Sequence, residues 1–515
     1  MKQSLIAILL FAFPFLSQAI DVVELRQPGS DKIVIKFMFR NGSLSDPAGK
    51  EGLTDMTASL ITEGGTKQFT STQISDLIYP WAAGMGASVD KEVSIFTYSM
   101  HKDHFDRFYP VIRDLMLNPR FDVEDFKRVK SNQQNYIDEV IRTSSDEEYS
   151  KKALEHLLFR GTAYQHPVAG TSNGLKSITL EDAIAHYRSM FNRNNVMIGL
   201  AGSYSDQQLT SIRKDMEALP DGKAAPEVQQ PNPRQPEGIE VEIITKPNTL
   251  GSAIFAGFPM EITRSNDDFA ALMIANSWLG EHRKSYSRLY QKIREQRSMN
   301  YGDYTYIEWY QNGGGNMLPR PGYPRSSNYF SMWLRPVQTA QSLKGQYSEL
   351  SSIEVGHAHF ALRMAIREME KLIEGGLTQE DFDLTKTFLK SYVKLYAQTT
   401  EQQLGYLMDS RFYRRADWLT ELDALLDKCT IEDVNRAMRK YWQTKSFYIA
   451  IVTDVSEAKP LAGSLLENRP SPMSYSNALK AVLTDEILAE DEVVSTYPLK
   501  VTKVDIIPSE KMFRN

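Results

Sequence analysis

Cysteine is nearly absent from this 515-residue sequence, in which Cys429 is the single example. One cysteine excludes a disulfide within the chain and a zinc site built from several cysteines. The fold must therefore depend on its hydrophobic core, and a chain of this length buries a large one. Hydrophobic residues make up 42% and charged residues 24% of the sequence, which is the balance of a folded globular protein.

Long apolar runs are also missing. The run at the N-terminus, Leu5–Leu16, has 12 residues, fewer than the ~20 that a transmembrane helix needs. Lys2 precedes this run and small residues, Ser17 and Ala19, follow it. Residues 1–19 are therefore predicted to be a secretory signal peptide. We expect an exported protein, periplasmic and without a membrane span.

The chain has no strong excess of charge of either sign. It contains 59 Lys and Arg against 65 Asp and Glu, which gives a formal net charge of −6. Binding to nucleic acid relies on a basic surface. The charge balance therefore disfavours a nucleic-acid partner.

A proline-rich stretch divides the sequence. Residues 216–238 contain five prolines together with Gly, Gln and Lys, and they are predicted to be a linker. We expect one domain over 20–215 and a second over 239–468. Residues 469–515 are polar, and we expect an irregular C-terminal tail there.

The two predicted domains share a pattern. Residues 177–202 and 429–453 align without gaps, and both place a Thr before an acid three residues later. This spacing is related to the capping box that starts a helix. In both segments a helix of about 12 residues then gives way to an apolar strand. An ancient duplication is the preferred explanation.

The remaining strand signals indicate the fold class. Strands and long helices are mixed without regular alternation, which favours an α+β fold. We expect two similar halves, each with a largely antiparallel sheet and helices on one face. The predicted strands are 31–39 and 92–100 in the first half, and 241–244 and 253–258 in the second.

Short motifs occur in a fixed order along both halves. In the first half they are Ile33–Phe39, Asn41-Gly42-Ser43, Gly52, Glu63-Gly64-Gly65-Thr66, Gly86-Ala87-Ser88, His166-Pro167 and Gly170-Thr171. In the second half they are Ser287-Arg288-Leu289, Arg294-Glu295 and Tyr301-Gly302. Their order and spacing resemble the pitrilysin/insulinase family of zinc peptidases, the inverzincins, over nearly the whole mature chain.

The zinc motif of that family is missing. Active members carry His-x-x-Glu-His on the helix after the first Gly, where two His bind zinc and the Glu activates water. By spacing, Asp55 and Ser59 stand at the His positions and Ala58 at the Glu. The window contains no His at all, so no shift of register restores the motif. The family's later Glu falls near Asp138 or Glu139. The resemblance therefore implies a degenerate site and no metal in this chain.

Other candidates for metal binding or nucleophilic chemistry are weak. Two histidine pairs lack a metal-binding pattern and are interpreted as surface or capping residues, and the other histidines are scattered. The pairs are His101 with His104 and His357 with His359, and the others are His156, His166, His186 and His282. Cys429 has no His near it in sequence and is interpreted as a buried small residue.

The second half keeps a different part of the family's machinery. The family has an Arg and, seven residues later, a Tyr that bind the substrate backbone at the zinc of the other half. Arg294 and Tyr301 match that spacing. Both side chains donate hydrogen bonds suited to a carbonyl that develops negative charge. The alternative is that Arg294 is an ordinary charge on a helix surface and that Tyr301 faces the core.

A long loop follows. Residues 309–330 contain Gly313–Gly315 and three prolines. Long loops in compact domains are often functional. Its aromatic and basic side chains are candidates for contact with an extended peptide, the alternative being a plain surface loop: Tyr310, Tyr323, Tyr329, Arg320 and Arg325.

The resemblance implies three functional hypotheses. The first is a non-catalytic, substrate-binding subunit of a heterodimeric zinc peptidase, in which the partner holds the zinc and this chain supplies Arg294 and Tyr301. The second is an inactive peptide-binding or scaffold protein of the same fold, for instance a homodimer. The third, a self-sufficient zinc peptidase, is disfavoured by Ala58 and the missing histidines.

Overall fold

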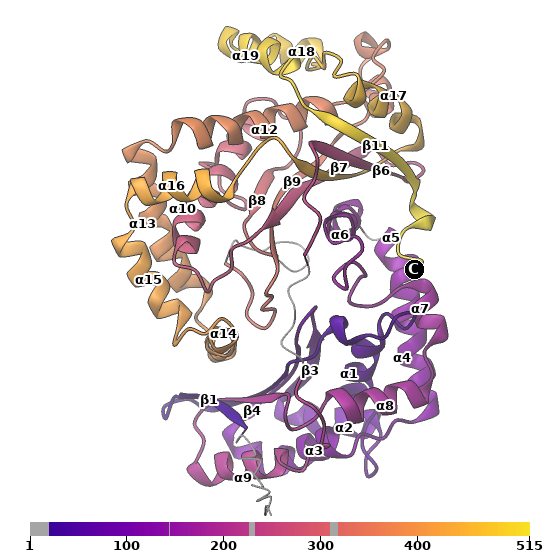
Figure 1. The fold of residues 1–515 in the computed structure, drawn as a ribbon, viewed down its shortest axis with the longest axis vertical. Helices are drawn as coiled ribbons and strands as arrows, with labels where there is room; N and C mark the ends of the chain where they lie inside the picture. The colour runs from indigo at the N-terminus through magenta and orange to yellow at the C-terminus, as the bar shows by residue number, and fades with distance from the viewer. Residues whose placement is uncertain (1–19, 144, 226–231, 310–317) are drawn as a thin grey trace, which may run out of the picture.

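The computed structural model describes residues 20–143, 145–225, 232–309 and 318–515. The predicted signal peptide, part of the predicted linker and Tyr310 lie outside the described residues. The described chain forms two halves, each built on one β-sheet with helices packed against it (Figure 1). This confirms the predicted α+β class with two similar halves.

The first half contains a five-stranded sheet in the order β1-β5-β2-β4-β3. Its strands are β1 (Asp21–Arg26), β2 (Lys32–Phe39), β3 (Gly84–Val89), β4 (Ser94–His101) and β5 (Val196–Gly202). All neighbours pair antiparallel except β1, which runs parallel to β5. The two strands predicted in this half correspond to β2 and β4.

The central strand β2 is apolar over most of its length because both faces of the sheet are covered. Ile33, Ile35 and Phe37 pack against the helices of the first half. Val34 and Met38 belong to a separate cluster on the opposite face. A strand buried on two sides does not show the simple polar–apolar alternation of a half-exposed strand.

The second half contains a six-stranded sheet in the order β11-β6-β10-β7-β9-β8. Its strands are β6 (Ile239–Thr245), β7 (Gly251–Met260), β8 (Asp303–Tyr306), β9 (Asn328–Gln338), β10 (Phe447–Thr453) and β11 (Val501–Pro508). β6 runs parallel to both β10 and β11, and the other pairs are antiparallel. The largely antiparallel character is as predicted.

Each sheet has its own layer of helices. In the first half these are α1 (Leu53–Glu63), α2 (Ser71–Ile78), α3 (Phe105–Leu117), α4 (Val123–Asn135), α7 (Ser172–Ser177), α8 (Leu180–Met190) and α9 (Asp206–Met216). In the second half they include α10 (Asp268–Gly280), α12 (Ala358–Gly375), α13 (Gln379–Tyr396), α15 (Trp418–Lys428), α16 (Ile431–Tyr441) and α17 (Val455–Leu466). The main hydrophobic core of the second half lies between its helices and its sheet.

The repeated sequence segments form equivalent structures. Thr179 caps α8 and Thr430 caps α16, each in a capping box with an Asp three residues later. α8 leads into β5 and α16 into β10. β5 and β10 each run parallel to the first strand of their own sheet. The two halves therefore share this part of their topology, as a duplication predicts.

One helix from each half covers the sheet of the other half. α6 (Asp146–Leu158) packs against β7 and β10 of the second sheet, and α14 (Thr400–Phe412) packs against β1 and β5 of the first. The Ser150 hydroxyl of α6 lies 3.1 Å from the Ala253 carbonyl oxygen and 2.9 Å from that of Ala450. The prediction of helices on one face thus describes only the main layer, because an exchanged helix occupies the second face.

The region after 469 is not an irregular tail. It contains α18 (Asn477–Lys480), α19 (Asp485–Ser495) and β11, which adds an edge strand to the second sheet. After β11 the chain crosses to the first half, where the Ser172 and Asn173 amides donate hydrogen bonds to carbonyls of 513 and 514 at 3.0 and 2.9 Å. We call residues 509–515 the C-terminal strap. We predicted a tail instead of these elements because residues 469–515 are mostly polar.

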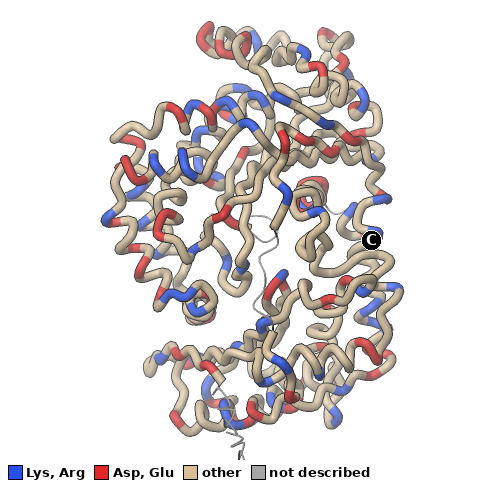
Figure 2. Tube along the Cα trace, in the orientation of Figure 1, with Lys and Arg blue, Asp and Glu red and all other residues tan. Residues whose placement is uncertain are grey.

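Charges are distributed over the whole molecule. Figure 2 shows Lys and Arg interspersed with Asp and Glu in both halves. In the part of the chain that the structure describes, no helix has the length and apolar character required to cross a membrane.

Candidate functional site

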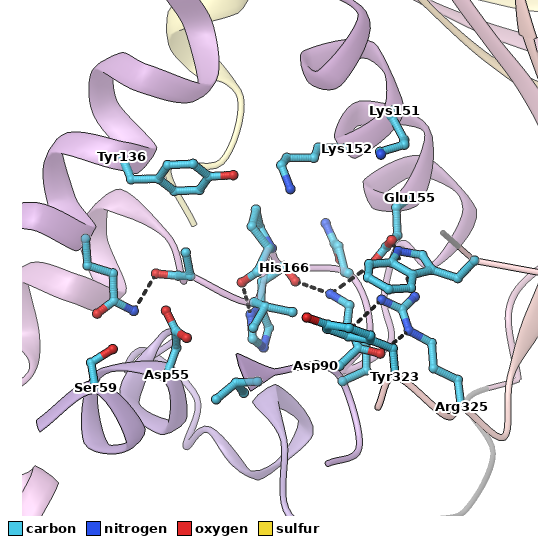
Figure 3. Close-up of a pocket in the computed structure, with 18 of the residues that line it drawn as sticks. Asp55, Ser59, Asp90, Tyr136, Lys151, Lys152, Glu155, His166, Tyr323 and Arg325 are labelled. Carbon is cyan, nitrogen blue, oxygen red and sulfur yellow. Dashed lines mark hydrogen bonds and ion pairs between the residues drawn. The ribbon is translucent and has the colours of Figure 1, made fainter. Parts of the chain in front are cut away.

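A cavity of about 410 Å³ lies between the two halves. Figure 3 shows the side chains that line it. The first half contributes α1, α4, α6 and the turn between β3 and β4, and the second half contributes Trp309, Tyr323 and Arg325. Pockets of a few hundred Å³ are of the size that holds small ligands.

The N-terminus of α1 is fixed by a close backbone contact. Gly52 has φ 100°, and the Asp46 carboxylate accepts hydrogen bonds from the Gly52 and Thr54 amides at 2.7 Å each. A Cβ on Gly52 would lie 2.7 Å from the carbonyl oxygen of Ala169, next to Gly170. Only glycine allows this conformation and this approach. The contact sets the direction in which α1 presents its side chains.

The structure places the three degenerate motif residues on two different faces of α1. Asp55 and Ser59, one helical turn apart, line the cavity together with Glu63. Ala58 is 1% exposed and packs in the core beneath the first sheet. The cavity face of α1 therefore carries two carboxylates and a hydroxyl, with no imidazole.

The next wall is formed by α4 and the π-helical turn Tyr136–Val140 that follows it. Asn132, Gln133 and Tyr136 line the cavity. Asp138 and Glu139, near which the family's later Glu falls by spacing, do not line the cavity, and the Asp138 carboxylate accepts a hydrogen bond from Ser172. The π-helical turn brings the Tyr136 phenol to the cavity face.

These residues do not fit the family's zinc ion. Zinc in such a site is held by His nitrogens and a carboxylate in tetrahedral geometry. The side chains on α1, on α4 and on the turn after it are carboxylates, a hydroxyl, amides and a phenol. The His166 imidazole lines the cavity from the segment before α7. Among the residues that the structure describes, no three His, Cys, Asp or Glu side chains are grouped closely enough to hold a metal. The arrangement provides no basis for metal-assisted hydrolysis.

A buried ion cluster connects the two halves beside the cavity. The Arg325 guanidinium contacts both carboxylate oxygens of Asp90 at 2.7 Å and the Glu155 carboxylate at 3.4 Å. The Lys91 ammonium lies 3.1 Å from the other oxygen of Glu155. We call Asp90, Lys91, Glu155 and Arg325 the interhalf ion cluster. It joins the β3–β4 turn, α6 and the second half.

Electrostatic interactions keep Glu155 and Arg325 ionised although both are buried. Burial alone would raise the pKa of Glu155, but the positive charges of Arg325 and Lys91 outweigh it and lower the pKa to about 2. Burial likewise acts to lower the pKa of Arg325, and Asp90 and Glu155 raise it well above its ordinary value instead. Glu155 and Arg325 are therefore charged at neutral pH.

The long loop contributes an aromatic wall to the cavity. The rings of Trp309 and Tyr323 have centroids 5.4 Å apart, and the Arg325 guanidinium lies 4.1 Å from the Trp309 ring centroid. The segment is held by α14, because the Gly322 amide donates to Asp409 at 3.0 Å. The hydrogen bond to α14 therefore fixes the described part of the predicted loop at Gly322.

The loop residues considered for peptide contact have different surroundings. Tyr323 lines the cavity. Tyr329 is 2% exposed within β9, and Arg325 is engaged in the interhalf ion cluster. Trp309 was not predicted as a cavity residue. A charged triplet at a turn between two apolar strands, Asp90-Lys91-Glu92, was the available signal for the missed ion cluster.

Arg294 and Tyr301 lie outside the cavity lining. Arg294 is part of the π-helical turn Tyr290–Glu295 and donates hydrogen bonds to the Tyr290 hydroxyl and, at 2.8 Å, to Glu295. Tyr301 is 77% exposed, and its ring centroid lies 5.8 Å from the Arg335 guanidinium. The pair is presented at the surface of the second half rather than toward the degenerate site of the same chain.

The histidine pairs have structural surroundings. His101 is exposed and accepts a hydrogen bond from the Asp103 amide at 3.3 Å, a capping role. His357 and His359 are buried rather than at the surface, and they contact the Ser474 carbonyl and the Ser464 hydroxyl. Both side chains therefore belong to the interior of the second half and not to its surface.

Two further residues have pKa values displaced by burial. Burial raises the pKa of the Cys429 thiol to about 11, so the residue stays protonated, in keeping with the interpretation as a buried small side chain. His166 lines the cavity, and burial lowers its pKa to about 4. Its imidazole is therefore neutral at neutral pH.

Comparisons with known proteins agree with this fold. Two family models match the chain: "Insulinase (Peptidase family M16)" over 21–172 and "Peptidase M16 inactive domain" over 177–332. Together they cover more than half of the 515 residues. The chain belongs to the insulinase family, peptidase family M16.

Individual relatives are distant. A Helicobacter pylori protein named "Non-peptidase homolog YmxG" is 22% identical over 82% of this chain and 90% of its own length. A Bacillus subtilis "Uncharacterized zinc protease YmxG" is 21% identical over 57% of this chain and 69% of its own. A crystal structure described as a peptidase M16 inactive domain from Pseudomonas fluorescens superposes with a TM-score of 0.70 at 19% identity, covering 85% of this chain and 96% of that one.

Asp55→Asn is expected to stabilise the protein at pH 8 but not at pH 4. Burial, and next the charge of Glu63, raise the pKa of Asp55 to about 7. An unfolded Asp ionises near its ordinary pKa, so wild-type stability is lost as the pH rises from about 4 to about 7. An Asn side chain does not ionise, so the variant does not lose stability over this pH range. Urea unfolding at pH 8 is expected to show a free energy of unfolding at least about 1 kcal/mol higher for Asp55→Asn than for the wild type.

The matched control is the exposed Asp76 on α2, for which Asp76→Asn leaves stability unchanged at both pH values. Equal stability of Asp55→Asn and wild type at pH 8 would contradict the assigned environment of Asp55.

Proposed function

We propose that this chain is a non-catalytic M16-family protein that binds extended peptides as one subunit of an exported heterodimer, in which the partner holds the zinc. The observation that carries the proposal is the cavity face of α1. It presents Asp55 and Ser59 where the family's active members present zinc-binding histidines, and Ala58 is buried in the core. A helix of this composition neither binds zinc nor activates water.

The comparisons support the non-catalytic part of this proposal. One relative is named a non-peptidase homolog, and one solved structure of the same fold is described as an inactive domain. Both names belong to other proteins. They agree with the side chains found here at the degenerate motif.

The edge of the first sheet supports peptide binding. β3 is the outermost strand, its one partner among the described strands is β4, and Gly86 and Ala87 are exposed. Val89 at its end lines the cavity. An edge strand has unpaired backbone groups that can pair with an extended peptide. A peptide added to β3 would run along the wall of the cavity.

The position of Arg294 and Tyr301 supports a partner. Tyr301 is 77% exposed and does not line the cavity of this chain. An exposed Tyr that keeps the family's spacing to an Arg is available to a second subunit. Permanent complexes of this kind bury on the order of 2,000 Å² or more.

Reconstitution with a zinc-bearing relative tests the proposal. The mature chain and an exported M16 protein with an intact His-x-x-Glu-His motif from the same cell are purified separately and mixed at micromolar concentration. We expect one species of combined mass in gel filtration, and hydrolysis of extended peptides by the mixture that exceeds the sum of the separate proteins. Separate elution with no gain in hydrolysis would contradict the heterodimer. It would favour the scaffold hypothesis if this chain then binds peptides as a homodimer.

Tyr301→Phe is expected to lower turnover of the reconstituted pair by at least roughly tenfold, because one hydrogen bond to the developing charge is worth about 10²–10³ in rate. The substitution removes a hydroxyl and leaves the ring. Assembly and the partner's zinc content should not change. Tyr79→Phe, at a tyrosine that is 86% exposed on the first half, is the control and should retain full turnover. Normal turnover of Tyr301→Phe would leave the residue without a role in the reaction.

Export is tested on the native protein. We expect the mature form in the periplasmic fraction, with its sequence starting at Ile20. A protein found in the cytoplasmic fraction with residues 1–19 still attached would contradict this part of the proposal.

A further inference from the structure

An acidic and a basic side chain face the cavity from different walls. Asp55 projects from α1 and Lys152 from α6, as Figure 3 shows. Among the described residues, neither side chain forms an ion pair or a hydrogen bond. Charged groups that line a cavity without a partner are the groups that a ligand can satisfy.

No carboxylate of the described residues forms an ion pair with Lys152, although its charge contributes to the lowered pKa of Glu155. Its neighbour Lys151 is paired with Glu148 at 3.1 Å. The two oxygens of Glu155 contact Lys91 and Arg325. The Lys152 ammonium instead lies 6.0 Å from the ring centroid of Tyr136, whose hydroxyl also points into the cavity. An ammonium and a phenol that converge on one space are a suitable pair of donors for a carboxylate.

Asp55 likewise has no cation paired with it in the part of the chain that the structure describes. The other acid on the same helix face, Glu63, lies 3.1 Å from Arg128. The Gln133 amide nitrogen donates to the Gly52 and Ala169 carbonyl oxygens at 3.0 and 2.9 Å, so it does not serve Asp55. A ligand ammonium would satisfy the Asp55 carboxylate, with the Ser59 hydroxyl as a second acceptor one helical turn away.

The space between the two charges suits an uncharged body. Trp309 and Tyr323 form an aromatic wall, with ring centroids 5.4 Å apart. The cavity volume of about 410 Å³ is near the lower end of the range for ligand sites, about 300–1,000 Å³. A molecule with an ammonium at one end, a carboxylate at the other and an apolar side chain between them matches all three features.

We infer that the cavity binds a short peptide with both termini free, its ammonium at Asp55, its carboxylate at Lys152 and a side chain against Trp309 and Tyr323. The inference rests on the proposed peptide-binding role and adds to it the size of the ligand, its orientation and the recognition of both termini. Asp55, which stands where active family members have a zinc-binding histidine, would then bind an amine.

Calorimetric titration of the isolated mature chain with alanyl-phenylalanine tests the inference. We expect saturable one-to-one binding of the free dipeptide. N-acetylation removes the ammonium and C-terminal amidation removes the carboxylate, and each change is expected to weaken binding at least roughly tenfold, since a hydrogen bond between charged groups is worth that much or more. These comparisons use the wild-type chain, so they hold even if a variant fails to fold.

Two variants assign the ends. Asp55→Asn should bind the free and the N-acetylated dipeptide with similar affinity, and Lys152→Gln should do the same for the free and the amidated dipeptide. Lys127→Gln is the matched control. Lys127 is 64% exposed on α4, pairs with Glu124 and does not line the cavity. Its affinity for all three ligands should equal that of the wild type.

Three results would overturn the inference. They are no binding of the free dipeptide up to about 10 mM, equal affinity for the free and blocked forms, and equally tight binding of a simple alkyl amine without a carboxylate. Because the isolated chain is used, each of these results leaves the reconstitution experiment unaffected. Loss of heterodimer assembly, in turn, leaves the dipeptide measurement unaffected.

Discussion

Replacing Arg325 by Met is expected to destabilise the protein by about 3–5 kcal/mol, because removal of one partner leaves buried charges without compensation. Asp90 would lose two hydrogen bonds of 2.7 Å, and its side chain is 1% exposed. Of its two ion pairs, Glu155 would keep the one with Lys91. Met has a similar stem, so the loss reflects charge more than packing. Urea unfolding at pH 7, monitored by tryptophan fluorescence, measures the effect.

Arg193→Met is the control for this substitution. Arg193 pairs with Asp221 at 3.0 Å, but the two side chains are 40% and 73% exposed. Exposed pairs contribute about 0–1 kcal/mol. A loss below about 1 kcal/mol for Arg325→Met would mean that the interhalf ion cluster does not hold the halves together in solution.

Replacing Phe513 by Ala is expected to cost about 3–5 kcal/mol, the usual effect of truncating a buried Phe. Phe513 is 2% exposed in the core that the two halves share. Its ring meets Tyr149 and His156 edge-on, with centroids 5.6 and 5.7 Å apart. The C-terminal strap thus carries an apolar anchor from the second half into the first. Deletion of 509–515 should destabilise the protein at least as much.

Tyr79→Ala provides the comparison, because Tyr79 is 86% exposed and its removal should change stability by no more than about 0.5 kcal/mol. If Phe513→Ala unfolds at the same urea concentration as Tyr79→Ala, the strap does not contribute to the native fold.

The elements that were predicted well are those with strong local signals. The alternating patterns at 31–39 and 92–100 identified β2 and β4. The Thr-to-Asp spacing at Thr179 and Thr430 identified two capped helices with the strands that follow them. These signals depend on neighbours within a few residues. The fold class followed from their order along the chain.

The connections between the halves could not be predicted in this way. α6 has the sequence of an ordinary amphipathic helix of the first half, and nothing local shows that it packs on the second sheet. Arg325 and Asp90 are 235 residues apart, so their pairing has no spacing rule. β11 did offer apolar residues at Val501, Val504 and Ile506, but its polar surroundings led to the prediction of a tail.

The candidate site was predicted in part. A spacing of four residues places Asp55 and Ser59 on one helical face, and both do line the cavity. The opposite wall with Lys152 was missed, because it comes from the exchanged helix α6. The spacing of Arg294 and Tyr301 matches the family, but spacing alone does not show that Tyr301 lies at the surface.

Zinc content and peptide hydrolysis of the isolated mature chain test the central claim most directly. The protein is purified without chelator in the presence of zinc, analysed for metal by mass spectrometry, and assayed on a mixture of unstructured peptides. Because Asp55, Ala58 and Ser59 replace the zinc motif, we expect far less than one zinc per chain and no hydrolysis that a chelator abolishes. Zinc close to one per chain, removed by chelator together with peptidase activity, would contradict it.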